Sequence, residues 1–274
     1  MNPPDNAILE PATPSRVHFT AESVVRCLDL FCCAGGAGEG YRRAGFDVTG
    51  VDIRPQPRNP HRFVQGDALE YLRVHGHEFD FIHASPPCQA HTAMRTMWNA
   101  KKHADLIGPT LELLERTGKP WVMENVEGAP LRNPIRLCGT MFGLGVGDAE
   151  LRRHRLFETS AHGWAPVFLP ECRHGSRVVG IYGGHVRNRI RTIGIYGEGC
   201  RYSVRKHDKG VDDFTVEDGR KAMGIDWMTL AELCQAIPPA YTEFLGKHAL
   251  SHLTANPGPE RGRADDNQQK EQVT

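Results

Sequence analysis

The sequence has no excess charge of either sign and no long hydrophobic run. Its 33 lysines and arginines balance 33 aspartates and glutamates, so the whole-chain charge predicts no polyanionic partner. A partner such as a nucleic acid would have to be bound by a local basic patch. No apolar stretch is long enough to cross a bilayer, and we therefore expect no membrane association.

A secretory signal is also lacking. Residues 1–16, MNPPDNAILEPATPSR, have neither the basic start nor the apolar stretch of a signal peptide. We therefore expect a cytoplasmic protein whose eight cysteines are reduced thiols rather than a disulfide framework.

What is present is the composition of a soluble globular protein, with 39% hydrophobic and 24% charged residues. A length of 274 residues allows one large domain, or one domain with a small insert. Residues 1–22 and 253–274 are rich in proline or polar side chains and have little to bury. They predict a disordered N-terminal arm and a disordered tail.

Between these ends, strand-like and helix-like segments alternate. The apolar patterns predict strands at 26–31, 47–53, 62–67, 79–85 and 120–126, and helices at 39–46 and 105–118. Two further helices are expected, at 214–226 and after a proline turn within 235–250. This alternation predicts an α/β fold, a mostly parallel sheet with helices on both faces.

Polar or reactive residues accompany the ends of five predicted strands. The glycine-rich stretch DLFCCAGGAGEG, Asp52, Asp67, Cys88 and Glu124 lie at successive strand ends. Ligands of parallel sheets bind there; glycines let the backbone approach a ligand, and an acid can accept hydrogen bonds from ribose hydroxyls. Each feature alone also fits a tight turn, a helix cap or a surface charge. Together they favour an adenosine-containing cofactor beside a nucleophile.

The stretch ASPPCQAHT, residues 84–92, places Cys88 just past the fourth strand and behind Pro86 and Pro87. A cysteine that only fills a core lies more often inside the apolar run. At a rigid exit turn the thiol is held in place and partly exposed, which favours a reactive role.

The order of DLFCCAGGAGEGYRRAGF, VDI, GD, ASPPCQ, MENV, LRRHR and QAIPPAYTEFLG resembles the DNA cytosine methyltransferases that modify carbon 5. The resemblance covers most of residues 26–160 and 214–250. It implies the Rossmann-like fold of S-adenosylmethionine-dependent methyltransferases, with a small β-rich target-recognition insert. It also implies methyl transfer from S-adenosyl-L-methionine to a cytosine flipped out of double-stranded DNA.

By this resemblance, Cys88 is the nucleophile that adds to carbon 6 of cytosine. Glu124 holds ring nitrogen 3, Arg155 contacts the base carbonyl, and Arg153 supports the catalytic loop. For the two arginines, a solvated charge cluster is the alternative.

The resemblance also implies a cofactor site in which Asp52 binds the ribose hydroxyls and Asp67 meets the adenine amine. The full set implied for cofactor binding is Phe31, Cys32, Ala34, Gly35, Gly36, Asp52, Ile53, Asp67, Ala68, Pro87 and Gln235. The segment after Cys88 would be a mobile loop that closes over the flipped base, with Gln89, Thr92 and Arg95 meeting DNA.

Four places depart from the family pattern. Cys33 stands where a glycine is usual in the first turn, and Leu151 stands where a glutamine often precedes the R-x-R motif. His91 replaces a frequent phenylalanine, and Cys234 with Gln235 replaces a glycine–asparagine pair. The last change leaves open a changed cofactor preference or weaker activity.

Residues 172–209 form a basic stretch with seven arginines and two lysines against one glutamate and one aspartate, a net charge of +7. GIYG occurs twice in it, which suits short strands joined by turns. Such an insert can supply phosphate and base-edge contacts, and we expect DNA to be bound by Arg187, Arg189, Arg191 and Arg201. A solvated basic face without a partner is the alternative.

Cys172, His174, Cys200 and His207 raise the question of a zinc site within this stretch. Their spacing fits no compact ligand pattern, so free residues and no metal are expected.

These observations divide the chain into an arm (1–22), a cofactor-binding catalytic domain (23–160), a target-recognition insert (161–213), a segment completing the catalytic domain (214–252) and a tail (253–274). We predict a monomeric bacterial or phage DNA (cytosine-5-)-methyltransferase, located in the nucleoid or in a phage-infected cell. A companion restriction endonuclease is a candidate partner. The alternatives are RNA cytosine as the substrate, a modified methyl donor, or a catalytically silent DNA-binding relative.

Overall fold

The computed structural model describes residues 24–87, 105–161, 163–175, 177–182, 185–188 and 214–256. The predicted arm and most of the predicted tail lie outside these residues. Among the described helices, none is both long and apolar enough to span a bilayer.

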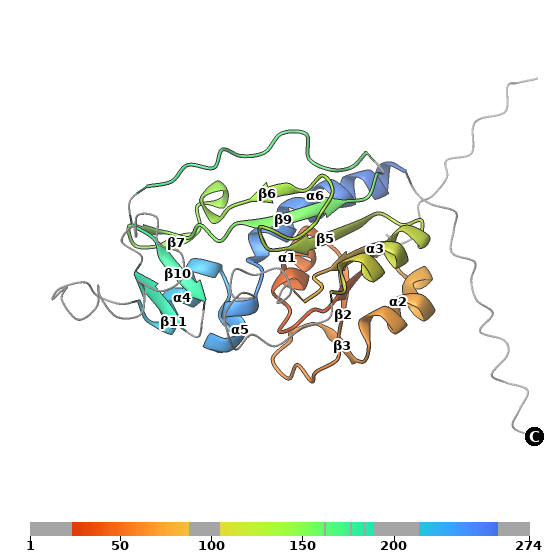
Figure 1. Cartoon of the computed structure of the whole chain (residues 1–274), viewed down its shortest axis with the longest axis horizontal. Coiled ribbons are helices and arrows are strands. Elements are labelled where there is room, and N and C mark those ends of the chain that lie inside the picture. Colours follow the sequence, from red (N-terminus) through yellow and green to blue (C-terminus); the bar gives the residue numbers. More distant parts are fainter. Residues whose placement is uncertain are drawn as a thin grey trace, which may run out of the picture.

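The centre of the protein is a seven-stranded sheet with the order β3-β2-β1-β4-β5-β9-β6 (Figure 1). Five strands run parallel: β1 (Arg26–Leu30), β2 (Asp47–Asp52), β3 (Arg62–Gln65), β4 (Phe81–Ala84) and β5 (Trp121–Asn125). They are the five strands expected from the sequence. β9 (Arg155–Thr159) lies antiparallel to both β5 and β6 (Ile135–Leu137). The strands β6 and β9 were not expected from the sequence.

Helices cover both faces of the sheet, as the fold class requires. Alternation along β1 shows how: Cys27 belongs to one apolar cluster, whereas Leu28 and Leu30 belong to another. The first cluster contains residues of α1 (Gly36–Ala44) and α6 (Pro239–Ala255), and the second contains residues of α2 (Ala68–His75) and α3 (Ile107–Arg116). The mostly parallel sheet with helices on both faces is confirmed.

The contact between α1 and α6 brings the two ends of the described chain together. A Cβ atom at Gly40 of α1 would lie 2.0 Å from Oγ1 of Thr242, so only glycine allows this approach. The hydroxyl of Thr242 donates to the carbonyl of Ala37 at 2.8 Å. The C-terminal helix α6 therefore lies beside α1 in the helix layer on one face of the sheet.

A third apolar cluster lies at the end of the molecule drawn on the left of Figure 1. It includes Val179 and Ile181 of β10 (Val179–Tyr182), with residues of α4 (Val216–Met223) and α5 (Leu230–Gln235). β10 pairs antiparallel with β11 (His185–Asn188), so a hairpin does occur in the predicted insert. The remaining short elements are η1 (Gly76–Glu78), η3 (Gly139–Phe142), β7 (Gly145–Val146) and β8 (Ala149–Glu150). The division into domains stays a prediction.

Candidate active site

A cavity of about 470 Å³ opens beyond the carboxyl ends of the parallel strands. This volume is within the range of small-molecule sites. Most residues that the sequence assigned to the cofactor or to catalysis line it, namely Phe31, Cys32, Ala34, Gly36, Asp52, Ile53, Asp67, Ala68, Pro87, Glu124, Arg155 and Gln235. Gly35 and Arg153 are not in the lining, and Cys88 lies outside the described residues.

The turn between β1 and α1 is strained where it borders the cavity. Phe31 and Cys33 both have positive φ angles, 58° and 46°, a conformation that residues other than glycine rarely adopt. This explains why the family usually has glycine where Cys33 stands. Strain of this kind concentrates at ligand-binding turns and costs about 1–3 kcal/mol per residue.

Asp52 holds this turn against the end of β2. Its Oδ2 accepts a hydrogen bond from the amide of Cys33 at 3.0 Å, and its Oδ1 accepts one from the amide of Arg54 at 2.9 Å. An ionised carboxylate has about four acceptor positions, so two bonds leave capacity for ribose hydroxyls.

Asp67 is both a helix cap and part of the cavity wall. Its Oδ1 accepts from the amides of Leu69 and Glu70, each at 2.9 Å, which caps the N-terminus of α2. Within the described residues, both of these bonds fall on Oδ1. Oδ2 therefore remains available to a ligand amine, so the two interpretations of this acid are compatible.

Glu124 and Arg155 form an ion pair in the cavity wall. Nε of Arg155 lies 3.1 Å from Oε1 of Glu124, because β9 starts beside the end of β5. Burial raises the pKa of Glu124, while Arg155 and a hydrogen bond from Ser85 act in the opposite direction. A buried carboxyl with a raised pKa is suited to sharing a proton with a ligand.

Arg153 does not face the cavity and instead joins three chain segments. Its guanidinium donates to the carbonyls of Ile181, Cys234 and Ala236 at 2.8–2.9 Å. The hydroxyl of Tyr241 donates to the Arg153 carbonyl at 2.9 Å. Arg153 is therefore a positioning residue that links β10 to the end of α5 and to the residue that follows it.

The turn that leads to Cys88 is anchored by an asparagine whose role was not predicted from the sequence. Nδ2 of Asn125 donates to the carbonyl of Pro86 at 3.0 Å, and its Oδ1 accepts from the amide of Val126. Asn125 directly follows Glu124 in MENV. The motif could have indicated it, because a buried asparagine at a strand end needs polar partners.

A buried hydrogen-bonded row behind Glu124 was also missed. Tyr41 Oη lies 2.9 Å from Nδ1 of His83, and Nε2 of His83 lies 2.8 Å from Oγ of Ser85. Burial lowers the pKa of His83 to about 3, so its ring is neutral and its two nitrogens satisfy one hydroxyl each. The signal was a histidine inside the apolar strand FDFIHAS.

The C-terminal segment closes the cavity beside α1. A Cβ at Gly36 would lie 2.6 Å from the carbonyl oxygen of Ile237, which itself lines the cavity. Nε1 of Trp227 donates to the carbonyl of Ala34 at 2.8 Å. Sγ of Cys33 lies 3.7 Å from Oε1 of Gln235, so two of the departures from the family pattern meet here.

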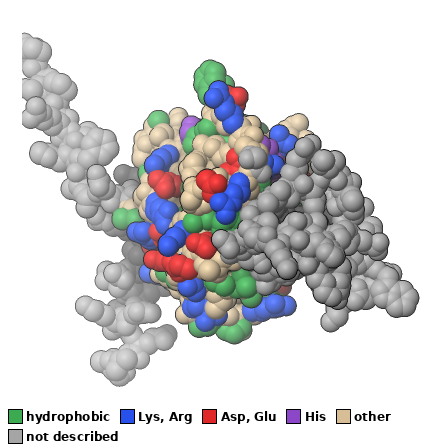
Figure 2. Space-filling model, turned by 90° about the vertical axis from the view of Figure 1, so that its left-hand side faces the viewer, with side chains coloured by type: hydrophobic (Ala, Val, Ile, Leu, Met, Phe, Trp, Pro, Cys, Tyr) green, Lys and Arg blue, Asp and Glu red, His purple; other side chains and the backbone are tan. Residues whose placement is uncertain are grey.

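The predicted DNA contacts fall largely outside the described residues. These are Gln89, Thr92, Arg95, Arg189, Arg191 and Arg201, while Arg187 is placed only as a backbone position in β11. On the end of the molecule that faces the viewer in Figure 2, visible side chains of both charges are interspersed. The predicted basic surface therefore stays a prediction.

Known proteins resemble this chain in sequence and in fold. No protein-family model matches the chain. The type II methyltransferase M.AgeI of Thalassovita gelatinovora is 26% identical over 189 residues, which are 61% of this chain and 41% of that relative. The chain thus aligns with about two fifths of the length of this curated relative.

Two solved structures each align with more than four fifths of this chain. One is a proposed DNA modification methyltransferase encoded within an E. coli prophage, with a TM-score of 0.54, 16% identity, and 84% of this chain and 99% of that chain covered. The other is the Entamoeba histolytica methyltransferase EhMeth, with a TM-score of 0.54, 14% identity, and 85% and 99% covered. At such identities the likeness shows the fold.

The chain therefore has the fold of these two methyltransferases. The resemblance drawn from the motifs is confirmed as far as a methyltransferase relative and a methyltransferase fold.

Proposed function

We propose that this protein transfers a methyl group from S-adenosylmethionine to carbon 5 of a cytosine flipped out of double-stranded DNA, with Cys88 as the nucleophile. The observation that carries the proposal is the buried Glu124–Arg155 pair, which shares one cavity with Asp52 and Asp67. The Glu124–Arg155 pair can bind the edge of a base, and the two aspartates can bind an adenosine. Both sets of side chains line the same cavity.

The residues divide into two sets. Asp52, at the end of β2, and Asp67, at the start of α2, would hold the ribose and the adenine amine of the cofactor. The cofactor supplies an electrophilic methyl group on a sulfonium. Glu124 and Arg155 would hold ring nitrogen 3 and the carbonyl of the base, because a carboxyl with a raised pKa can donate to that nitrogen.

Cys88 would act from the Pro86–Pro87 turn, which Asn125 fixes at the carbonyl of Pro86. Its thiolate would form a bond to carbon 6, which makes carbon 5 nucleophilic enough to take the methyl group. Loss of the proton from carbon 5 then breaks the bond between sulfur and carbon 6 and restores the thiolate. Arg153 would act only by positioning neighbouring segments.

The relative M.AgeI and the prophage neighbour carry names that refer to type II and DNA modification methyltransferases. These names support DNA as the substrate. A cytoplasmic location, a companion restriction endonuclease and a monomeric state belong to the same proposal.

The test is covalent trapping on duplexes that contain 5-fluorocytosine. Fluorine cannot leave carbon 5 as a cation, so an adduct that depends on S-adenosylmethionine should accumulate and survive denaturing electrophoresis. Because the target sequence is unknown, a randomised duplex library is used, and mass spectrometry of nucleosides from treated DNA and RNA names the product and the nucleic acid.

Cys88→Ser should abolish the adduct, since an alcohol is hardly ionised at neutral pH. Glu124→Gln should slow trapping while leaving the nucleophile intact. An adduct mapped to another cysteine, or 5-methylcytosine found only in RNA, would overturn the proposal. A protein that binds the library but forms neither adduct nor product would be the silent relative.

A further inference from the structure

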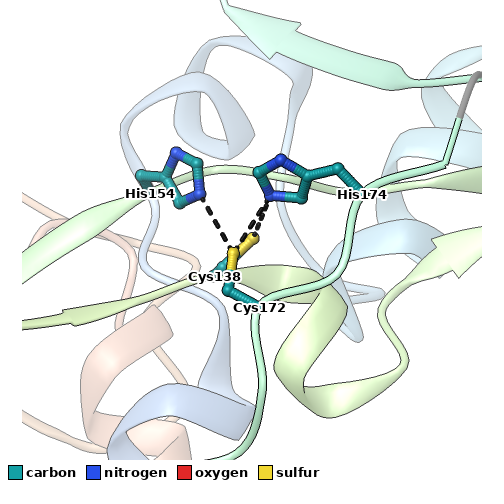
Figure 3. Close-up of side chains that lie close together, drawn as sticks. All are labelled: Cys138, His154, Cys172 and His174. Carbon is teal, nitrogen blue, oxygen red and sulfur yellow. Dashed lines mark hydrogen bonds between the residues drawn. The ribbon is translucent and has the colours of Figure 1, made fainter.

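Four side chains that could bind a metal ion converge about the edge of the sheet. Cys138, His154, Cys172 and His174 each direct one ligand atom into a common space, and these four atoms lie within 4.8 Å of one another. Figure 3 shows both imidazole rings turned toward the two sulfur atoms. Cys138 is buried, whereas His174 reaches the surface.

The distances between nitrogen and sulfur atoms lie within about 0.5 Å of those expected around a tetrahedral zinc. Nε2 of His174 lies 3.1 Å from Sγ of Cys172 and 3.4 Å from Sγ of Cys138. Nε2 of His154 lies 3.6 Å from Sγ of Cys172. A tetrahedral zinc with the usual bond lengths separates its sulfur and nitrogen ligands by about 3.6 Å.

The surrounding residues would support such ligands. Nδ1 of His154 lies 3.6 Å from Oε2 of Glu127, which leaves Nε2 for a metal and gives the other nitrogen a carboxylate partner. Oγ1 of Thr140 lies 3.2 Å from Sγ of Cys138 and 3.9 Å from Sγ of Cys172. Its hydroxyl can therefore donate to a metal-bound thiolate.

We propose that Cys138, His154, Cys172 and His174 bind one structural zinc ion. Two thiolates and two neutral imidazoles are a ligand set that zinc prefers, and binding would displace the two thiol protons. Four protein ligands leave no open position, so the site would stabilise the fold and not take part in methyl transfer.

The position of the ligands gives the site its role. Cys138 follows β6, His154 lies between Arg153 and Arg155 at the start of β9, and the other two ligands precede β10. Zinc would therefore tie the chain entering the predicted insert to the strand that presents Arg155 to Glu124. By sequence spacing, Cys172 and His174 are considered with Cys200 and His207, and no metal is expected; the spatial cluster contains Cys138 and His154 in place of the second pair.

The first measurement is the metal content of the whole protein purified from zinc-supplemented cells, with extended X-ray absorption at the zinc edge. About one zinc per chain, with two sulfur and two nitrogen ligands, is expected. Replacement by Co²⁺ should give the intense visible bands of a tetrahedral thiolate site. A protein that retains no zinc and takes up no stoichiometric Co²⁺ would overturn the proposal.

The second measurement separates the two possible ligand sets. His174→Ala and Cys172→Ser should lose the zinc, whereas Cys200→Ser and His207→Ala should keep it. Loss from the second pair of variants would reject the site as assigned. Substitution of the exposed His174 disturbs the fold less than substitution of the buried Cys138, so His174→Ala is the variant of choice. A chelator should lower the Tm of the wild type and leave that of folded His174→Ala unchanged.

Discussion

At the scale of single residues, the site depends on carboxyl groups whose surroundings differ. Glu124 is buried and paired with Arg155, Asp67 is exposed at a helix N-terminus, and Asp29 is almost completely buried beneath the cavity. Burial raises the pKa of Asp29 to about 8, with Asp52 acting in the same direction and the Gly38 amide in the other. Each acid therefore responds differently to substitution and to pH.

Asp29 should make the cofactor-free protein less stable as the pH rises. Its folded pKa is raised to about 8, so folding takes up a proton between its unfolded pKa, about 3.9, and that value. The stability that protonated Asp29 contributes is fully present below its unfolded pKa of about 3.9. It declines as the pH rises and is lost once the pH has passed the folded pKa of about 8. The free energy of unfolding should fall by up to about 1.4 kcal/mol per pH unit in this window. Urea unfolding at pH 5.5 and 7.5 measures it.

The isosteric variant Asp29→Asn provides the comparison, because it cannot titrate. Its free energy of unfolding should change much less between these two pH values than that of the wild type. Equal pH dependence in both proteins would show that Asp29 is ionised throughout.

Asp67 allows capping to be separated from ligand binding. Asp67→Asn keeps a good N-cap for α2 but removes the carboxylate, so stability should change little while cofactor affinity falls by about 1–3 kcal/mol. Asp67→Ala should lose the same affinity and also about 1 kcal/mol of stability. Calorimetry with S-adenosylmethionine and thermal unfolding make the comparison. Unchanged affinity in both variants would remove Asp67 from the cofactor site.

At the scale of elements, α1 packs against α6 and against the segment that precedes α6, which contributes Ile237 to the cavity wall. Gly40 faces Thr242 with no room for a side chain, and Gly36 meets the carbonyl of Ile237 in the same way. Both glycines are required by packing against residues far away in the sequence, α6 for Gly40 and the segment before α6 for Gly36, and no local turn requires them.

Gly40→Ala should therefore destabilise the protein, because its Cβ would overlap Oγ1 of Thr242. Overpacking of this kind costs typically about 1–3 kcal/mol, and the displaced α6 should also weaken cofactor binding. Gly66→Ala is the matched control, since a Cβ there meets nothing within 4 Å. Equal unfolding midpoints for the two variants would contradict the packing described for α1 and α6.

At the scale of the whole molecule, the sequence predicted the five parallel strands and the residues at their ends. Apolar periodicity and glycine positions are local signals, and they located β1, β2, β3, β4 and β5. β6, a three-residue strand at the edge of the sheet, and β9, which lies between β5 and β6, were missed because short antiparallel strands carry little periodicity. Contacts such as Asn125 with Pro86, or Cys138 with His174, depend on residues 36 or more positions apart, which no local pattern reveals.

Whole-molecule charge offers a last prediction. Because the chain is neutral overall but residues 172–209 carry a net +7, DNA binding should depend strongly on salt. Neutralising Arg187, Arg189, Arg191 and Arg201 together should flatten the slope of log K against log salt by about one unit for each phosphate that the protein no longer neutralises. Arg116→Ala on α3 is the control. Equal slopes in both variants would place the DNA-binding surface elsewhere.

The hydrogen bond from Thr242 to Ala37 joins residues 205 positions apart, and this separation has a consequence for synthesis. A ribosome adding about 5–20 residues per second needs roughly ten to forty seconds to make the intervening chain. During that time β1 and the strands made soon after it lack α6, which packs on one face of the sheet, and the cavity wall lacks Ile237. A nascent chain therefore has no complete cavity until the segment that contains Ile237 and α6 has been made.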